Sequence, residues 1–152
     1  MVKACVVFVV GHRRWGKSTT LSTLAEGMRR YISLDSVEFF IQRMSNDDEP
    51  PKFYKKMREA KPADVPHLIV AFCPTLRDDS QARQCLIGLR RRGYALFFWV
   101  MRQQQKPGTT GTITPEEIKS LKKYGSVKVS KGLAEKSRRA KALRHFIRKV
   151  VK

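Results

Sequence analysis

The stretch Gly11-His12-Arg13-Arg14-Trp15-Gly16-Lys17-Ser18 is the part of the sequence from which the fold can be inferred. It fits the pattern G-x-x-x-x-G-K-[ST], in which a glycine-rich loop places backbone N–H groups around phosphates. The preceding run, residues 6–10, is apolar and rich in valine, as is typical of a buried parallel strand. After the loop, Leu21, Leu24 and Ala25 recur at helical spacing. A strand, this loop and a helix in that order are the context that the pattern requires.

The loop predicts a site for a nucleoside triphosphate, ATP or GTP, with Mg²⁺. Gly11 and Gly16 allow positive φ and leave room for a phosphate, and the helix N-terminus adds partial positive charge. Lys17 is expected to reach the β- and γ-phosphates, and the Ser18 hydroxyl to hold Mg²⁺. The expected nucleotide contacts are Gly11, His12, Arg13, Arg14, Trp15, Gly16, Lys17, Ser18 and Thr19. The alternative is a glycine-rich turn with an exposed lysine.

The composition is that of a globular chain with strong positive charge. Its 152 residues, 41% of them hydrophobic, predict one domain over 1–152. No apolar run approaches the length of a membrane span, so no membrane association is expected. Cys5, Cys73 and Cys85 lack metal-ligand spacing and predict reduced thiols in a cytoplasmic protein. The net charge of +19 indicates a polyanionic partner, most often nucleic acid, with a solvated basic surface as the alternative.

Strands and helices are expected to alternate along the chain. Strands are predicted at 3–10, 31–34, 67–73, 94–101 and 126–129. Helices are predicted at 17–30, around 37–44, from 53 to near 62, at 78–92, from 115 to 125 and at 134–151. This alternation predicts a parallel sheet of about five strands with helices on both faces. Because ligands bind beyond the carboxyl ends of such strands, Asp35, Thr75 and Arg102 are expected to converge on the phosphate loop.

These features together resemble small P-loop kinases of the nucleotide and polynucleotide kinase type. Ile32-Ser33-Leu34-Asp35-Ser36 resembles the strand-two end of polynucleotide 5′-kinases, where an Asp activates the acceptor hydroxyl. Residues 72–79 resemble the strand-three end of polynucleotide and adenylylsulfate kinases. Residues 106–110, leading to 114–118, resemble the lid tail and next helix of polynucleotide kinases. The resemblance implies a P-loop NTPase fold, a three-layer α/β/α arrangement, with a short lid-like loop at 102–114.

Two departures from the family pattern bear on turnover. Arg102 is followed by three glutamines, where kinases usually place a helix and a second Arg. The third strand ends at Cys73 instead of an Asp that would order Mg²⁺-bound water. Either departure is compatible with weak chemistry or with nucleotide binding without turnover. Asp78 and Asp79 are candidate substitutes, although a helix start also suits them to capping.

An enzyme is favoured: ATP–Mg²⁺-dependent phosphoryl transfer to a nucleic-acid 5′-hydroxyl or to a nucleotide. The resemblance implies that Lys17 binds the phosphates, that Asp35 takes the acceptor proton, and that Arg102 with Lys106 stabilises the migrating group. Helix capping by Asp35 and an exposed lid position for Arg102 are the alternatives. The alternative function is a non-kinase, ATP-binding switch or accessory protein that binds nucleic acid or a partner protein.

The charge distribution favours nucleic acid as the acceptor. After Glu117, thirteen Lys or Arg residues accompany one acid, Glu135, and most lie in the basic helix expected at 134–151. Phosphate neutralisation by such residues binds nucleic acid without sequence preference. The expected nucleic-acid contacts are Arg90, Arg91, Arg92, Arg138, Arg139, Lys141 and Arg144.

Overall fold

A six-stranded sheet forms the centre of the computed structural model, which describes residues 3–12, 15–27, 29–76, 80–101, 113–130 and 136–151. The strand order is β2-β3-β4-β1-β5-β6. Neighbouring strands are parallel except β2 and β3, which form an antiparallel pair. The strands are β1 (Cys5–Val10), β2 (Tyr31–Leu34), β3 (Val37–Gln42), β4 (His67–Phe72), β5 (Ala95–Val100) and β6 (Ser126–Val129).

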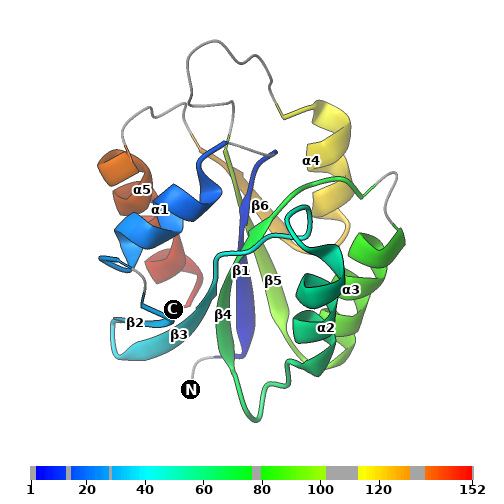
Figure 1. Cartoon of the computed structure of the whole chain (residues 1–152), viewed down its shortest axis with the longest axis horizontal. Helices are drawn as coiled ribbons and strands as arrows, with labels where there is room; N and C mark the ends of the chain where they lie inside the picture. The colour runs from blue at the N-terminus through cyan, green and yellow to red at the C-terminus, as the bar shows by residue number, and fades with distance from the viewer. Residues whose placement is uncertain are drawn as a thin grey trace.

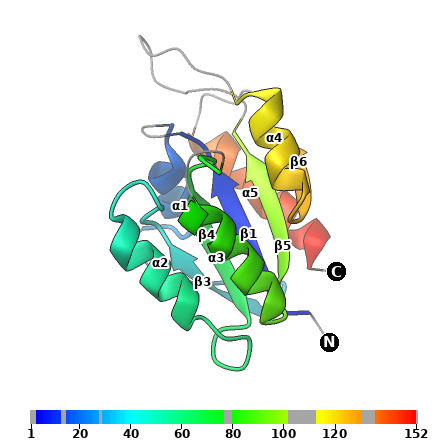
Figure 2. The same cartoon turned by 90° about the vertical axis from the view of Figure 1, so that its right-hand side faces the viewer.

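Helices cover both faces of the sheet (Figures 1 and 2). α1 and α5 pack together on one face, and α2, α3 and α4 lie on the other. The connection after β1 leads toward the β2 edge, whereas the later connections lead toward β6. Because parallel crossovers are right-handed, opposite directions place their helices on opposite faces. The helices are α1 (Lys17–Leu24), α2 (Pro50–Glu59), α3 (Ser80–Arg91), α4 (Pro115–Lys122) and α5 (Lys136–Val150).

The core lies around β1, whose six residues are all buried. The Phe8 ring lies between two rings from the flanking strands. Its centroid is 5.1 Å from that of Phe72 on β4 and 5.0 Å from that of Phe98 on β5. A strand buried on both faces needs an uninterrupted apolar run, which explains why the sequence pattern was clear here. No helix of the described residues is long and apolar enough to cross a membrane.

The segment expected to form a helix around 37–44 is instead the strand β3. Alternate side chains of β3 point toward the core, where Phe39 and Ile41 are buried. A tight turn joins β3 to β2. Asp35 and Ser36 form that turn with φ of 50° and 66°, as a two-residue hairpin loop requires. A short apolar run carries no periodicity that separates helix from strand. The sheet therefore has six strands, one more than expected.

The first helix is also shorter than the expected 17–30. α1 ends at Leu24, and the chain then takes positive φ at Glu26 (53°) and Gly27 (122°). Residues in the left-handed conformation terminate a helix when they directly follow it. The Gly27 N–H donates back to the Ser22 carbonyl (2.8 Å). The chain is then free to turn into the β2–β3 hairpin at the edge of the sheet.

Candidate nucleotide-binding site

The loop between β1 and α1 lies at the carboxyl edge of the parallel strands (Figure 1). The Gly11 N–H donates to the Phe72 carbonyl (3.1 Å), which ties the loop to β4. Gly16 is the N-cap of α1 in a left-handed conformation, with φ of 88°. A Cβ there would lie 3.2 Å from the guanidinium of Arg139, so conformation and space both favour glycine. Trp15 is buried and packs inward beside Gly11.

Lys17 lies across this loop. Its side chain is 7% exposed, and its Nζ donates to the Gly11 carbonyl (2.5 Å) and the His12 carbonyl (3.1 Å). Its nearest carboxylate is Asp47, with 3.9 Å between Nζ and Oδ1. Burial lowers the pKa of Lys17, and the negative charges of Asp47 and Asp48 oppose that shift. The two backbone carbonyls and the Asp47 carboxylate next to the Lys17 ammonium favour its charged form.

Ser18 and Thr19 follow in the first turn of α1, where both are exposed. This turn has no acidic residue, and Gly16 provides no side-chain cap. The first N–H groups of a helix have no intrahelical partner, and the dipole adds positive charge there. The structure therefore brings Gly11, Gly16, Lys17 and Ser18 together at the start of α1.

A carboxylate that the sequence analysis did not select lies next to Lys17. Asp47 belongs to the turn after β3, in which Ser45 and Asn46 are buried. The Asn46 side chain accepts from the Cys73 N–H (2.6 Å) and donates to the Cys73 carbonyl (3.1 Å). The Asp48 carboxylate accepts from the Ser45 N–H (2.9 Å). These bonds fix the turn against the end of β4 and bring Asp47 toward the phosphate loop.

The signal for Asp47 was present in the sequence. Three acids, Asp47, Asp48 and Glu49, follow the largely apolar segment 37–42, and ligand-binding residues follow strands in a parallel sheet. Because a helix was expected around 37–44, these acids did not follow an expected strand and were not selected.

His12 links the phosphate loop to α4 and β4. Its Nε2 is 2.7 Å from Glu117 Oε2, and its Nδ1 is 3.8 Å from Cys73 Sγ. Glu117 also completes a capping box, accepting from the Thr114 N–H (3.0 Å), while Thr114 Oγ1 accepts from the Glu117 N–H (3.1 Å). Burial raises the pKa of Cys73 to about 11, so its thiol stays protonated at neutral pH.

Asp35 does not lie at this site, and its expected position beside the phosphate loop is wrong. β2 is antiparallel to β3, so the end of β2 lies at the start of β3, at the opposite end of the sheet from the phosphate loop. There, Asp35 Oδ1 is 3.4 Å from Arg148 Nε, and both side chains are about half exposed. The sequence identified a strand end but could not give the direction of the strand.

Two of the arginines expected on the exposed face of the last helix have internal partners instead. Arg139 is 6% exposed, and its Nε donates to Thr20 Oγ1 (3.0 Å), which itself donates to the Gly16 carbonyl (2.8 Å). Burial lowers the pKa of Arg139. Arg144 donates through Nη2 to the Leu24 carbonyl (3.3 Å) at the end of α1. The two guanidiniums thus contact the first and last turns of α1, because α5 packs directly on that helix.

The remaining basic residues divide between two faces. Arg138 and Lys141 are exposed on α5, whereas Arg90 and Arg91 are exposed at the end of α3. Arg92 is half-buried and donates to the Met57 carbonyl. Since α3 and α5 cover opposite faces of the sheet, the two expected clusters do not form one surface (Figures 1 and 2). Arg13, Arg14, Asp78, Asp79, Arg102 and Lys106 lie outside the described residues.

Two de novo designed proteins of known structure are similar to this chain. One, a designed P-loop NTPase fold solved by solution NMR, has a TM-score of 0.52 and 14% sequence identity, covering 95% of this chain and 91% of that chain. The other, a designed PLOOP2X3 fold protein also solved by solution NMR, has a TM-score of 0.53 and 18% identity, covering 97% and 93%. No protein-family model and no curated protein sequence matches the chain. At these identities the comparisons concern the fold alone, and the chain has a P-loop NTPase fold.

Proposed function

We propose that the chain binds ATP or GTP with Mg²⁺ at residues 11–19 and transfers a phosphoryl group to a nucleic-acid 5′-hydroxyl or to a nucleotide. The observation that carries the proposal is Lys17, a buried ammonium that the loop carbonyls hold at the uncapped start of α1. An apolar residue would fill the same space without the cost of burying a charge, so packing alone does not explain a lysine there. Triphosphate oxygens are charged acceptors and would replace those carbonyls with stronger bonds.

The residues of the loop fit a magnesium-bound triphosphate. Gly16 has the left-handed conformation that a glycine-rich phosphate loop uses, and α1 has no acid in its first turn to repel phosphates. The exposed hydroxyl of Ser18 lies one residue after Lys17, where the motif holds Mg²⁺. When bound, the magnesium triphosphate supplies the transferable phosphoryl group and neutralises part of its charge. The protein contributes position and fixed charge.

Asp47 is the candidate for the carboxylate that orients the acceptor hydroxyl. It is 3.9 Å from Lys17 Nζ and 20% exposed, so an acceptor can reach it from solvent. Its turn is fixed by the two hydrogen bonds between Asn46 and Cys73, which limits the movement of the carboxylate. A positioned carboxylate typically contributes about 10²–10⁴ in rate as a general base. This role replaces the one expected for Asp35.

The test measures triphosphate binding and phosphoryl transfer separately. Lys17→Ala should weaken ATP or GTP binding far more than adenosine or guanosine binding. Asp47→Asn should retain triphosphate binding and lose transfer to a 5′-hydroxyl oligonucleotide or to mononucleotides by about 10²–10⁴. Asp35→Asn is the matched control and should transfer at the wild-type rate. Equal triphosphate affinity in wild type and Lys17→Ala would refute the binding site, and full transfer by Asp47→Asn would refute the acceptor role.

A nucleotide-dependent switch is the second candidate function. It is favoured by Cys73, whose protonated thiol stands at the end of β4 where kinases place a carboxylate. It is also favoured by the contact between His12 and Glu117, through which a change in the phosphate loop would reach α4. Triphosphate binding by the wild type without transfer to any hydroxyl, and without hydrolysis, would favour the switch over the kinase.

A further inference from the structure

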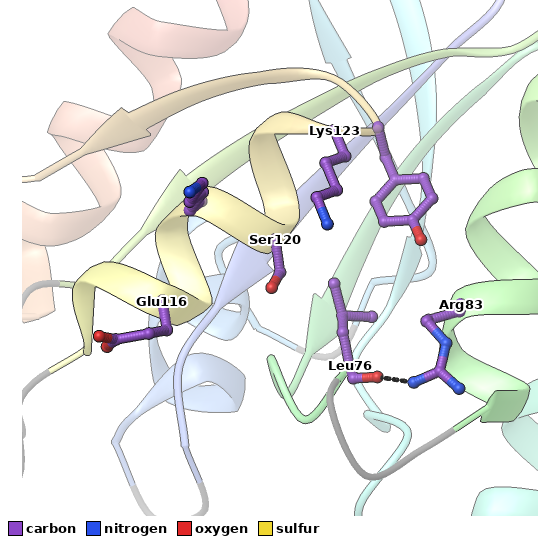
Figure 3. Close-up of a pocket in the computed structure, with 7 residues that line it drawn as sticks. Leu76, Arg83, Glu116, Ser120 and Lys123 are labelled. Carbon is purple, nitrogen blue, oxygen red and sulfur yellow. Dashed lines mark hydrogen bonds between the residues drawn. The ribbon is translucent and has the colours of Figure 1, made fainter.

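A cationic groove lies between α3 and α4, on the face of the sheet away from α1 and α5 (Figure 3). Its volume is about 460 Å³, within the range of small-ligand sites. Ser120 on α4 and Lys123 directly after it lie on the side of α4 near Leu76, and Arg83 reaches from α3 to the Leu76 carbonyl. The groove is lined by Leu76, Arg83, Lys119, Ser120, Lys123 and Tyr124, with Glu116 at the beginning of α4.

Among the described residues that line the α3–α4 groove, cations outnumber acids. The groove contains three cations, Arg83, Lys119 and Lys123, and one acid, Glu116. Within the described part of the chain, neither lysine has a carboxylate at ion-pair distance. Arg83 is held in place because its Nη1 donates to the Leu76 carbonyl. Cations gathered around one hollow, with one arginine fixed in position, favour an anionic ligand with several charged oxygens.

A further cation lies beside the groove. Arg90 is exposed on α3, and its Nη1 donates to the Lys123 carbonyl (3.2 Å), so its guanidinium lies beside the end of α4. A strand with repeated phosphates can extend from the groove toward Arg90, whereas a single small anion occupies one position.

The groove also contains an aromatic side chain and begins near the candidate nucleotide site. Tyr124 is half-buried on the groove, beside Lys123. Glu117, one helical position after Glu116, contacts His12 of the phosphate loop. Single-stranded nucleic acid is bound where a positively charged groove follows its backbone and an aromatic ring stacks on a base.

We propose that the α3–α4 groove binds single-stranded nucleic acid, with backbone phosphates on Arg83, Lys119 and Lys123 and a base against Tyr124. The proposal rests on the proposed function in identifying this strand as the phosphoryl acceptor, but the binding itself requires no triphosphate. The net charge of +19 supports a polyanion as the ligand. This assignment keeps Arg90 beside the proposed binding surface, through its hydrogen bond to the Lys123 carbonyl, and adds residues of α4 that the sequence analysis had not selected.

The test uses a fluorescein-labelled twelve-residue oligothymidylate and measures anisotropy over a salt series without triphosphate. The double variant Lys119→Ala/Lys123→Ala removes two groove cations. Lys55→Ala/Lys56→Ala is the matched control, since both lysines are exposed on α2 and outside the groove. Single strands give a salt slope of roughly 0.7 per neutralised phosphate, so the groove variant should lose about 1.4 from the slope. The control should retain the wild-type slope.

Tyr124→Leu tests the stacking contact, and its melting temperature is measured to show that it folds. Loss of one stacked base should weaken binding at least about fivefold while leaving the salt slope unchanged. Thymidine monophosphate is the competitor that distinguishes a strand from a free nucleotide. It should displace the oligonucleotide only at far higher concentration.

Several outcomes would overturn the proposal: no oligonucleotide binding by the wild type, equal losses in the groove and control variants, or displacement by thymidine monophosphate at the concentration of the oligonucleotide. Lys17→Ala separates this proposal from the proposed function. It should lose triphosphate binding and retain oligonucleotide binding. Oligonucleotide binding that disappears with Lys17 would place the strand at the phosphate loop and overturn the groove assignment, whatever the transfer assay gives.

Discussion

Replacing Arg139 by alanine should destabilise the protein far more than removing an exposed charge from the same helix. Arg139 is 6% exposed, and its guanidinium donates to Thr20 Oγ1, which in turn donates to the Gly16 carbonyl. Lys141, two residues further along α5, is exposed. Lys141→Ala therefore removes one positive charge from α5 without removing a buried contact, and it serves as the control.

The magnitude follows from two opposing effects. A hydrogen bond from a charged group contributes about 1.5–3 kcal/mol, and the buried stem of the arginine adds packing that alanine loses. Burial of the charge acts in the opposite direction, as the lowered pKa of Arg139 indicates. We expect a net loss of about 2 kcal/mol for Arg139→Ala. For a chain of this size, 1 kcal/mol corresponds to roughly 2–4 °C, so the melting temperature should fall by about 4–8 °C.

The assay is thermal unfolding followed by circular dichroism, with urea unfolding as the check on a two-state transition. Arg139→Met retains the apolar stem and should fall between wild type and Arg139→Ala. Triphosphate affinity should also decrease in Arg139→Ala, because the guanidinium lies against Gly16 of the phosphate loop. An Arg139→Ala protein that melts within about 1 °C of Lys141→Ala, a difference of a few tenths of a kcal/mol, would refute the reasoning.

Three further predictions concern single residues. Gly125→Ala should lower the free energy of unfolding by about 1–3 kcal/mol in urea titrations, since a Cβ at this position would overlap the Leu96 carbonyl oxygen. An unchanged urea midpoint would contradict this prediction. With a pKa of about 11, Cys73 has roughly one thiolate per thousand molecules at pH 8. Iodoacetamide should therefore modify half-buried Cys85 before Cys73 in the native protein, and mass analysis of the peptides checks this order. Asp35→Asn should melt within about 2 °C of wild type, because the ion pair of Asp35 with Arg148 is half exposed and Asn accepts positive φ. A larger decrease in melting temperature would mean that the surface ion pair is stronger than expected.

Local patterns in the sequence predicted the centre of the fold. The apolar runs of β1, β4 and β5 identified buried strands because a strand covered on both faces must be apolar throughout. The start of α4 was also predicted, and the capping box of Thr114 and Glu117 confirms it. Such caps depend on residues three positions apart, so their chemistry is contained in the sequence.

The edge of the sheet could not be predicted in the same way. The run at 37–42 is short, and its assignment as β3 depends on pairing with β2 and β4 rather than on its own periodicity. Without the antiparallel hairpin, the strand at 31–34 was expected to be parallel, which put Asp35 at the carboxyl edge. Asp47, which lies beside Lys17, followed an expected helix and was not selected.

The sequence by itself determined the phosphate loop, because glycine conformation, helix start and lysine position are all set within one short stretch. Only the tertiary structure decided which distant side chains complete the site. Asp47 is 30 residues from Lys17 along the chain, and Arg139 is 119 residues from its partner Thr20. The physical reason is that strand direction and helix face follow from long-range packing. A carboxylate or an arginine has the same local pattern whether it faces the site, the core or solvent.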